Sequence, residues 1–180
     1  LKHNMKLEIL SRILDVQNPK LTVVFCNTKK MVDELTAGLQ SRGYFADGLH
    51  GDLKQIQRDG VMNKFRNSTI DILVATDVAA RGIDVDDVDL VINYDMPQDV
   101  EYYVHRIGRT ARAGREGTAI SFVSPREMNT LSQIQKYTKT KIEKRDMPTL
   151  KDLIKRHEER FIEEIKEEIN KNEHTKELNL

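Results

Sequence analysis

Five short apolar runs, rich in β-branched residues, alternate along this chain with stretches whose apolar residues recur at helical spacing. Continuous apolar runs are typical of strands buried on both faces of a sheet. Strands separated by helices predict right-handed βαβ units and a parallel sheet covered by helices on both sides. The sequence therefore predicts an α/β fold, with strands at 21–26, 45–49, 70–75, 88–94 and 118–123.

Helical spacing between these runs predicts the covering helices. It indicates helices over 6–16 and 54–66, one ending near Arg42, one starting near Val100, and one through 128–137. Residues 141–144 are predicted as a sixth strand at the edge of the sheet. In parallel sheets of this kind ligands bind at the carboxyl ends of the strands, so polar residues that directly follow strands are the first candidates for a site.

From Thr149 onward the composition changes to Lys and Glu with a narrow apolar stripe at helical spacing. The stripe consists of Leu150, Ile154, His157, Phe161, Ile165 and Ile169. We therefore predict two parts, a domain over 1–148 and a charged amphipathic helical extension over 149–180. Two alternatives stay open for the extension: a solvated helix lying on the domain, or a helix that packs on another domain or subunit.

Charge and cysteine content exclude several classes of protein. The 29 Lys and Arg residues balance 29 Asp and Glu residues, which argues against a uniformly basic nucleic-acid-binding surface but leaves room for a local basic groove. Cys26 is the only cysteine, so a disulfide framework within one chain is excluded and a reducing, cytoplasmic setting is favoured. No apolar run approaches the length of a membrane span, and the start lacks a signal peptide and an initiator Met.

A nucleotide-binding loop is not found. Gly43 and Gly48 have the required spacing, but Leu49 and His50 stand where a phosphate-binding loop needs Lys followed by Ser or Thr. The chain is therefore not expected to bind a nucleotide tightly by itself.

The densest basic segment is 105–115, which contains His105 and four arginines. If the segment ends a helix, Arg109 and Arg112 share a face and can together grip a polyanion. The alternative is a solvated basic face.

Three polar segments follow predicted strands. Residues 75–84 contain Thr76 and Asp77 at the mouth of the third strand, and 50–58 contain Gly51 and Arg58 after the second. Asn27 and Thr28 follow the first. Each segment is compatible with phosphate binding, and each is equally compatible with simple capping of the next helix, by Asp77, Asp52 or Thr28. Tyr94, Tyr102 and Tyr103 could stack on bases, although packing is the favoured role.

Taken together and in this order, residues 23–28, 50–58, 75–84, 91–97 and 105–112 resemble motifs IV, IVa, V, Va and VI of DEAD-box ATP-dependent RNA helicases. The resemblance covers residues 6–148 and is to the C-terminal of the two RecA-like domains of that family. It implies a RecA-like parallel sheet and an ATP-dependent helicase that unwinds short RNA duplexes locally. ATP and RNA would bind across the cleft to the N-terminal RecA-like domain of the same polypeptide, which would hold most of the Mg²⁺ contacts.

The resemblance also implies roles for individual residues. Arg109 and Arg112 would be catalytic arginine fingers, Gly82 and Asp84 would contact the nucleotide, and His105 and Arg81 would couple the two domains. RNA phosphates would be held by Gly51, Arg58 and Thr76, with Thr28 and Asp77 as weaker candidates. Ala111 departs from the family, which usually has Gly there.

Two other functions remain open. One is a DNA-acting helicase of the wider superfamily, and the other is a non-catalytic module that binds RNA or protein. For the second, the stripe on the extension resembles segments that support dimers in some bacterial family members, so a homodimer through the C-terminal helix is a further expectation. No membrane partner is expected.

Overall fold

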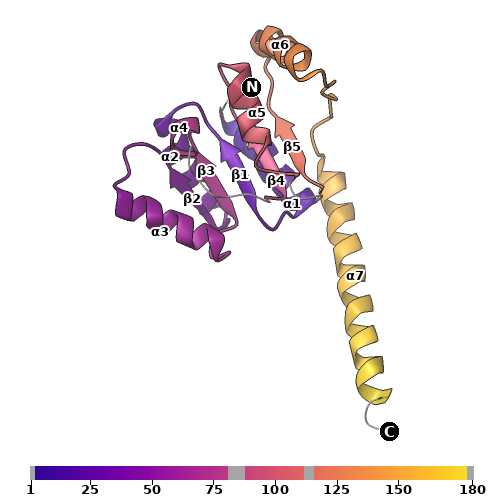
Figure 1. Ribbon diagram of the computed structural model, residues 1–180. Coiled ribbons are helices and arrows are strands. Elements are labelled where there is room, and N and C mark those ends of the chain that lie inside the picture. Colours follow the sequence, from indigo (N-terminus) through magenta and orange to yellow (C-terminus); the bar gives the residue numbers. More distant parts are fainter. Residues whose placement is uncertain (1–2, 81–87, 112–115, 178–180) are drawn as a thin grey trace. The chain divides into compact units, whose positions relative to one another are not determined.

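In the computed structural model, residues 3–80, 88–111 and 116–177 are described (Figure 1). The chain divides into two compact units. One comprises Leu1–Glu8 and Pro19–Lys144, and the other comprises Ile9–Asn18 and Arg145–Leu180. The first helix, α1 (His3–Gln17), contributes to both units.

The first unit is built on a five-stranded sheet in which every pairing is parallel. The strand order β2-β3-β1-β4-β5 places β1 at the centre, between β3 and β4. This is the arrangement of a RecA-like α/β fold, and the prediction of a parallel α/β sheet is confirmed. Each strand lies inside a predicted apolar run: β1 (Thr22–Phe25), β2 (Ala46–Leu49), β3 (Ile72–Ala75), β4 (Leu90–Asn93) and β5 (Thr118–Ser121).

Helices connect the strands, as the spacing predicted (Figure 1). The short helix α4 follows β3, where the sequence was equally compatible with phosphate binding and with a helix capped by Asp77. The helix is present, but Asp77 is its first residue and not its cap. The helices of this unit after α1 are α2 (Lys29–Ser41), α3 (Gln55–Arg66), α4 (Asp77–Ala80), α5 (Val100–Ile107) and α6 (Met128–Thr138).

Alternating residues of the central strands bury themselves against helices on the two faces of the sheet. On one face, Phe25 and Leu73 pack with the apolar side of α3, where Phe65 is 1% exposed. Strands β1, β3 and β4 are buried at every position, as expected for the centre of a sheet covered on both sides. The core therefore holds the carboxyl ends of three neighbouring strands at one edge of the sheet.

The sixth strand predicted at 141–144 is wrong, because this described segment forms no strand. Lys139 ends α6 in the left-handed conformation, with φ at 52°. The Ile142 N–H then donates to Gln135 Oε1 of that helix at 2.8 Å, and its side chain packs against the cluster around Tyr103 and Ile134. Ile142 is apolar because it covers α5 and α6, and not because it extends the sheet.

In the second unit, the long helix α7 (Leu150–Glu177) begins at a well-formed cap. Thr149 Oγ1 accepts from the Asp152 N–H at 3.3 Å, and Asp152 Oδ2 accepts from the Thr149 N–H at 2.7 Å. The Thr149 hydroxyl also donates to Asp152 Oδ2 at 2.6 Å, and this bond, together with that from the Thr149 N–H, holds the pKa of the Asp152 carboxyl below its ordinary value. The helical extension is therefore present, whereas a domain boundary at residue 148 stays a prediction.

Candidate functional site

The carboxyl edge of the sheet gathers polar side chains from segments far apart in the sequence. Asn27 follows β1, Asp77 follows β3, and Asn93 and Asp95 end or follow β4. Because β1 pairs with both β3 and β4 in register, the ends of these three strands meet at adjacent positions. This is the edge at which the sequence placed the candidate site.

One arginine, Arg106, reaches this edge from α5 and is 1% exposed. Its Nε donates to Asp77 Oδ1 at 2.6 Å, and its Nη2 donates to Asp77 Oδ2 at 2.7 Å, which makes a bidentate ion pair. Nη2 also donates to Asn27 Oδ1 at 2.9 Å. Nη1 donates to Asn93 Oδ1 at 3.2 Å and to the Asp95 carbonyl at 2.7 Å. All five N–H groups of the guanidinium are therefore used.

These contacts make Arg106 the connector of three strand ends. Its guanidinium also lies 5.2 Å from the centre of the Phe25 ring, a distance at which a cation is attracted to an aromatic face. Removing one partner of a buried ion pair typically destabilises a protein by about 3–5 kcal/mol, because the other charge is left uncompensated. The Arg106–Asp77 pair therefore fixes α5 and α4 to the sheet.

The role of Arg106 was not predicted, because the arginines of 105–115 form a single basic cluster in the sequence. A useful clue was present in the helix that starts at Val100. Tyr103 and Arg106 are three residues apart, so they share one helix face, and both are buried. Asp77, by contrast, was found, but its carboxylate is directed to Arg106, and a role in RNA binding stays a prediction.

Arg109 does not lie on a helix, so the condition for a helix face shared with Arg112 is not met at Arg109. Helix α5 ends at Ile107, and Gly108 forms its C-cap. Arg109 lies in the following turn, where its N–H donates to the Arg106 carbonyl at 3.2 Å and its own carbonyl accepts from the Val88 N–H at 3.2 Å. Val88 precedes β4, so this turn runs beside the beginning of that strand and not beside its carboxyl end.

The same turn is closed by a close backbone approach. The Thr110 hydroxyl donates to the Val88 carbonyl, and a Cβ added to Gly117 would overlap Thr110 Oγ1 and lie 2.9 Å from Thr110 Cβ.

Ala111 has φ at 58°, in the left-handed region that favours glycine. Of the remaining predicted site residues, Arg81, Gly82, Asp84 and Arg112 lie outside the described residues.

The predicted RNA contacts lie at the ends of β1, β2 and β3. Arg58, on α3, donates from Nη2 to the Ala79 carbonyl of α4 at 3.1 Å. Thr76 links β3 to α4, because its carbonyl accepts from the Ala80 N–H at 2.9 Å. Gly51 is exposed, and a Cβ there would meet nothing within 4 Å. Arg58 and Thr76 thus belong to neighbouring segments that are joined through α4.

Capping explains one of the polar segments and not another. Thr28 Oγ1 accepts from the Met31 N–H at 3.2 Å, so Thr28 does cap α2. Asp52 does not cap α3, because that helix begins at Gln55 with Lys54 as its N-cap. Instead, Asp52 pairs with Lys29 at 2.6 Å, and this hydrogen bond holds the pKa of the Asp52 carboxyl below its ordinary value.

His50 is held in place beside this pair. Its Nε2 lies 2.9 Å from Asp33 Oδ1, and its Nδ1 lies 3.4 Å from the Asp52 N–H, which donates to it. A ring whose Nδ1 accepts carries its proton on Nε2, so the ring donates to the Asp33 carboxylate. Asp33, His50 and Asp52 thereby join α2 to the loop that contains Gly51.

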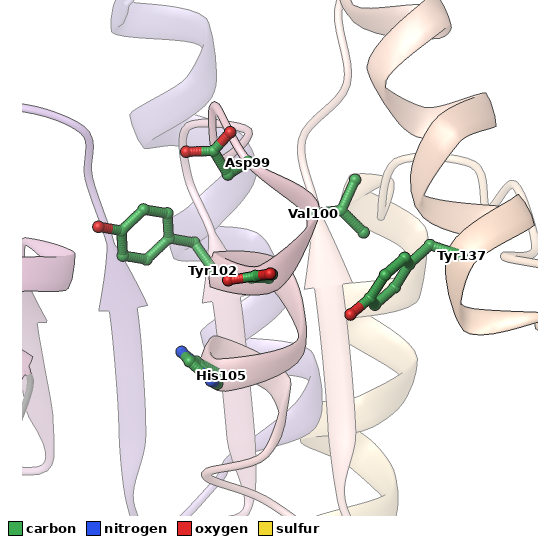
Figure 2. A pocket seen from close by; sticks show the side chains of 6 residues that line it. Asp99, Val100, Tyr102, His105 and Tyr137 are labelled. Atoms are coloured by element: carbon green, nitrogen blue, oxygen red, sulfur yellow. The ribbon is translucent and has the colours of Figure 1, made fainter.

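His105 projects from the exposed side of α5 into a shallow pocket of about 540 Å³. In Figure 2, Tyr102 and His105 point to one side of the helix, whereas Val100 faces Tyr137 of α6 on the other. Tyr103 and Tyr94 are buried, and burial raises the pKa of both phenols. Packing is thus confirmed as the role of these two tyrosines, and Tyr102 alone of the three lines the pocket.

The described residues contain no group of three or more His, Cys, Asp or Glu side chains that could hold a metal ion. None of the helices in that part of the chain is long and apolar enough to cross a membrane.

Comparison with known proteins decides the family. Residues 5–114 match the model of the helicase conserved C-terminal domain. The chain belongs to this family. DEAD-box ATP-dependent RNA helicase CshA of Bacillus cereus is 49% identical over 164 residues, which cover 91% of this chain and 31% of that protein. The chain therefore spans about a third of the length of that curated relative.

Solved structures of DEAD-box proteins share the fold of this helicase C-terminal domain. A DEAD-box protein from Methanococcus jannaschii is 45% identical with a TM-score of 0.75, and the match covers 81% of this chain and 40% of that one. S. cerevisiae Dbp5 bound to RNA and ADP BeF3 is 41% identical with a TM-score of 0.68, covering 73% of this chain and 36% of that one. The resemblance to the C-terminal RecA-like domain of DEAD-box helicases is thus confirmed.

Proposed function

We propose that this chain is the C-terminal half of an ATP-dependent RNA helicase that separates short RNA duplexes locally. The observation that supports the proposal best is the Arg106 network. It holds the segment that contains Arg109 and the loop that contains Thr76 on one rigid sheet. The name of the Bacillus cereus relative and the RNA-bound Dbp5 structure support the choice of ATP and RNA as ligands.

In this proposal, Arg109 and Arg112 act as arginine fingers toward the γ-phosphate of ATP. Gly82 and Asp84 contact the nucleotide, and His105 and Arg81 transmit closure between the domains. Phosphoryl transfer depends on positioning and charge neutralisation more than on covalent help, and an arginine finger is worth about 10³ to 10⁵ in rate. The rigid turn at Arg109 is suited to that task because its N–H and carbonyl groups are both anchored.

RNA binding is assigned to Gly51, Arg58 and Thr76, with Thr28 and Asp77 as weaker candidates. Exposed Gly51 allows a phosphate to approach the backbone closely. Contacts of this kind bind many sequences, and each phosphate contact changes the log–log salt slope by about −0.7 for a single strand. The bonds of Thr28 and Asp77 to Met31 and Arg106 leave Arg58 and Thr76 as the stronger candidates.

ATP and Mg²⁺ would be shared with an N-terminal RecA-like domain of the same polypeptide. The cations of this chain fit the phosphates of ATP, whereas the described residues offer no cluster of metal-binding side chains. We therefore assign Mg²⁺ mainly to the N-terminal domain. Splitting the site in this way makes hydrolysis conditional on closure. A cytoplasmic setting completes the proposal, because Cys26 is the only cysteine.

The test compares this chain with the intact protein, in which both domains are present. The intact protein should hydrolyse ATP in an RNA-stimulated manner, whereas the isolated chain should bind RNA weakly and hydrolyse no ATP. Robust hydrolysis by the isolated chain would refute the shared site. Competition between single-stranded RNA and DNA separates this proposal from a DNA helicase, since preferential binding of DNA would favour the latter.

A homodimer through α7 is a second part of the proposal. Ile154, Phe161, Ile165 and Ile169 are 43–64% exposed on one stripe of that helix. Exposed large apolar side chains in a regular stripe are typical of helices that pack on another helix. Light scattering at increasing concentration should show a dimer that Phe161→Glu abolishes, and a strict monomer at high concentration would contradict this part alone.

A further inference from the structure

The helix α4 is held from two sides by residues with different predicted tasks. Arg58, a proposed RNA contact on α3, donates to the Ala79 carbonyl of α4 at 3.1 Å. Arg106, on α5, holds the Asp77 carboxylate at the start of α4 with two bonds of 2.6 and 2.7 Å. Because α4 is a single turn of four residues, Asp77 and Ala79 cannot move independently of each other.

The backbone of Arg106 continues this connection to Arg109. The Arg106 carbonyl accepts from the Arg109 N–H at 3.2 Å, while its guanidinium reaches Asn27 and Asp95 at the carboxyl edge. Arg106 therefore spans from the strand ends to the turn that runs beside the beginning of β4. Its side chain sets the position of α5 along the sheet, and the position of α5 sets the location of the turn that contains Arg109.

Burial makes this arrangement specific. Arg106 is 1% exposed, and its five donors face acceptors at the end of β4 and in the segments that follow β1, β3 and β4. A shift of α5 by about 1 Å would take several of these bonds beyond hydrogen-bond distance and leave buried donors without partners, which is costly. The contacts thus define one position for the helix and not a range of positions.

We infer that Asp77 and Arg106 are positioning residues that set the location of the Arg109 finger relative to the RNA contacts Arg58 and Thr76. This inference rests on the proposed function. In this inference Asp77 acts through Arg106, which replaces its weaker assignment as an RNA contact. A carboxylate near phosphates would repel them, and the bidentate pair with Arg106 neutralises it. The expected consequence is that disturbing the pair lowers turnover without weakening the binding of either ligand.

The test measures kcat, KM for ATP and the Kd of single-stranded RNA in the intact two-domain protein. Asp77→Asn keeps the shape of the side chain but sets its amide donor against Arg106. Misplacing a catalytic group by about 1 Å can cost 10²-fold in rate, so we expect RNA-stimulated kcat to fall about 10- to 100-fold. KM and the RNA Kd should change little, because the finger acts in the transition state.

Asp47→Asn is the matched control. Asp47, in the edge strand β2, accepts from Lys64 Nζ at 3.0 Å, so this variant changes a paired carboxylate of the same sheet away from the Arg109 turn. Its kcat should equal that of the wild type. A loss of kcat as large as that of Asp77→Asn would show that the effect comes from general loosening of the sheet, and it would overturn the inference.

A double variant, Asp77→Asn with Arg106→Gln, addresses folding. It removes the uncompensated buried charge, so its melting temperature should exceed that of Asp77→Asn. Gln is too short to reach the acceptors of Arg106, so kcat should stay low. If kcat recovers together with the melting temperature, the pair is merely structural. If Asp77→Asn does not fold, the double variant answers the question by the same three measurements.

Two further outcomes separate the possible failures. An RNA Kd that rises in step with the loss of kcat would make Asp77 an RNA contact and overturn the inference. Wild-type kcat in Asp77→Asn would also overturn it. Absence of RNA-stimulated hydrolysis in the wild-type protein would instead refute the proposed function.

Discussion

Gly117 lies so close to Thr110 that no side chain fits between them. A Cβ at residue 117 would overlap the Thr110 hydroxyl and lie 2.9 Å from Thr110 Cβ. Thr110 cannot yield easily, because it is 6% exposed and its hydroxyl donates to the Val88 carbonyl. This approach joins the segment before β5 to the turn that contains Arg109.

Gly117→Ala should therefore destabilise the fold by about 1–3 kcal/mol, the usual cost of forcing an extra group into a packed site. Denaturant unfolding of the two proteins measures the difference. Gly60→Ala is the matched control, since a Cβ there meets nothing within 4 Å, and in a helix interior Ala is favoured over Gly by about 0.5–1 kcal/mol. The two substitutions should have opposite signs, and a neutral Gly117→Ala would contradict the close approach.

Ala111 offers the reverse substitution. Its φ of 58° lies in the left-handed region, where a residue with a Cβ is disfavoured by about 1–2 kcal/mol. Ala111→Gly should raise the free energy of unfolding by up to about 1 kcal/mol. The gain is smaller than the full cost of the left-handed conformation, because Gly has more freedom than Ala in the unfolded chain.

The control for that prediction is Ala37→Gly on the exposed side of α2, where Ala has ordinary helical geometry. It should lower stability by about 1 kcal/mol. Equal losses at both positions would show that the backbone at residue 111 is not strained.

Much of the fold followed from period and composition, because a strand buried on both faces must be a continuous apolar run. Val23, Val24 and Phe25 could not be placed elsewhere than inside a sheet. Ile142 was misassigned because an isolated apolar residue among lysines has no period, and its partners on α5 and α6 are set by tertiary packing.

The site was predicted less completely. Arg106 was overlooked because its partners Asn27, Asp77 and Asn93 are far apart in the sequence and meet only once β1, β3 and β4 pair. Arg109 does not lie on a helix for a local reason, since Gly108 caps α5 one residue before it.

Cys26 is expected to be inert in the folded protein. It is fully buried between Phe25 and Asn27, and burial together with the nearby Asp95 charge raises the pKa of its thiol well above the ordinary value of 9.0. Because the thiolate is the reactive form, a chromogenic disulfide reagent should not react with the native chain at pH 8 and should titrate one thiol after unfolding. Rapid labelling of the native chain would contradict the burial of Cys26.

The same shift predicts a pH dependence of stability. The folded chain keeps the thiol proton to a higher pH than the unfolded chain does, so Cys26 favours the native state fully at pH values below the unfolded pKa. This contribution decreases as the pH rises above that value, because the unfolded state then gains by ionising. Cys26→Ala should reduce the loss of stability between pH 8 and 10, as measured by denaturant unfolding. An identical pH profile in both proteins would count against the shift.

Arg109→Ala tests the finger itself. The backbone of Arg109 carries the two hydrogen bonds of its turn, to Arg106 and Val88, and this substitution leaves both in place. We therefore expect the variant to keep the native fold, as circular dichroism would show. In the intact protein, RNA-stimulated kcat should fall by about 10³-fold or more, with the RNA Kd unchanged. Arg66→Ala, at the exposed end of α3, removes one guanidinium elsewhere and should retain full turnover. Wild-type turnover in Arg109→Ala would remove this residue from the catalytic groups and leave Arg112 as the candidate finger.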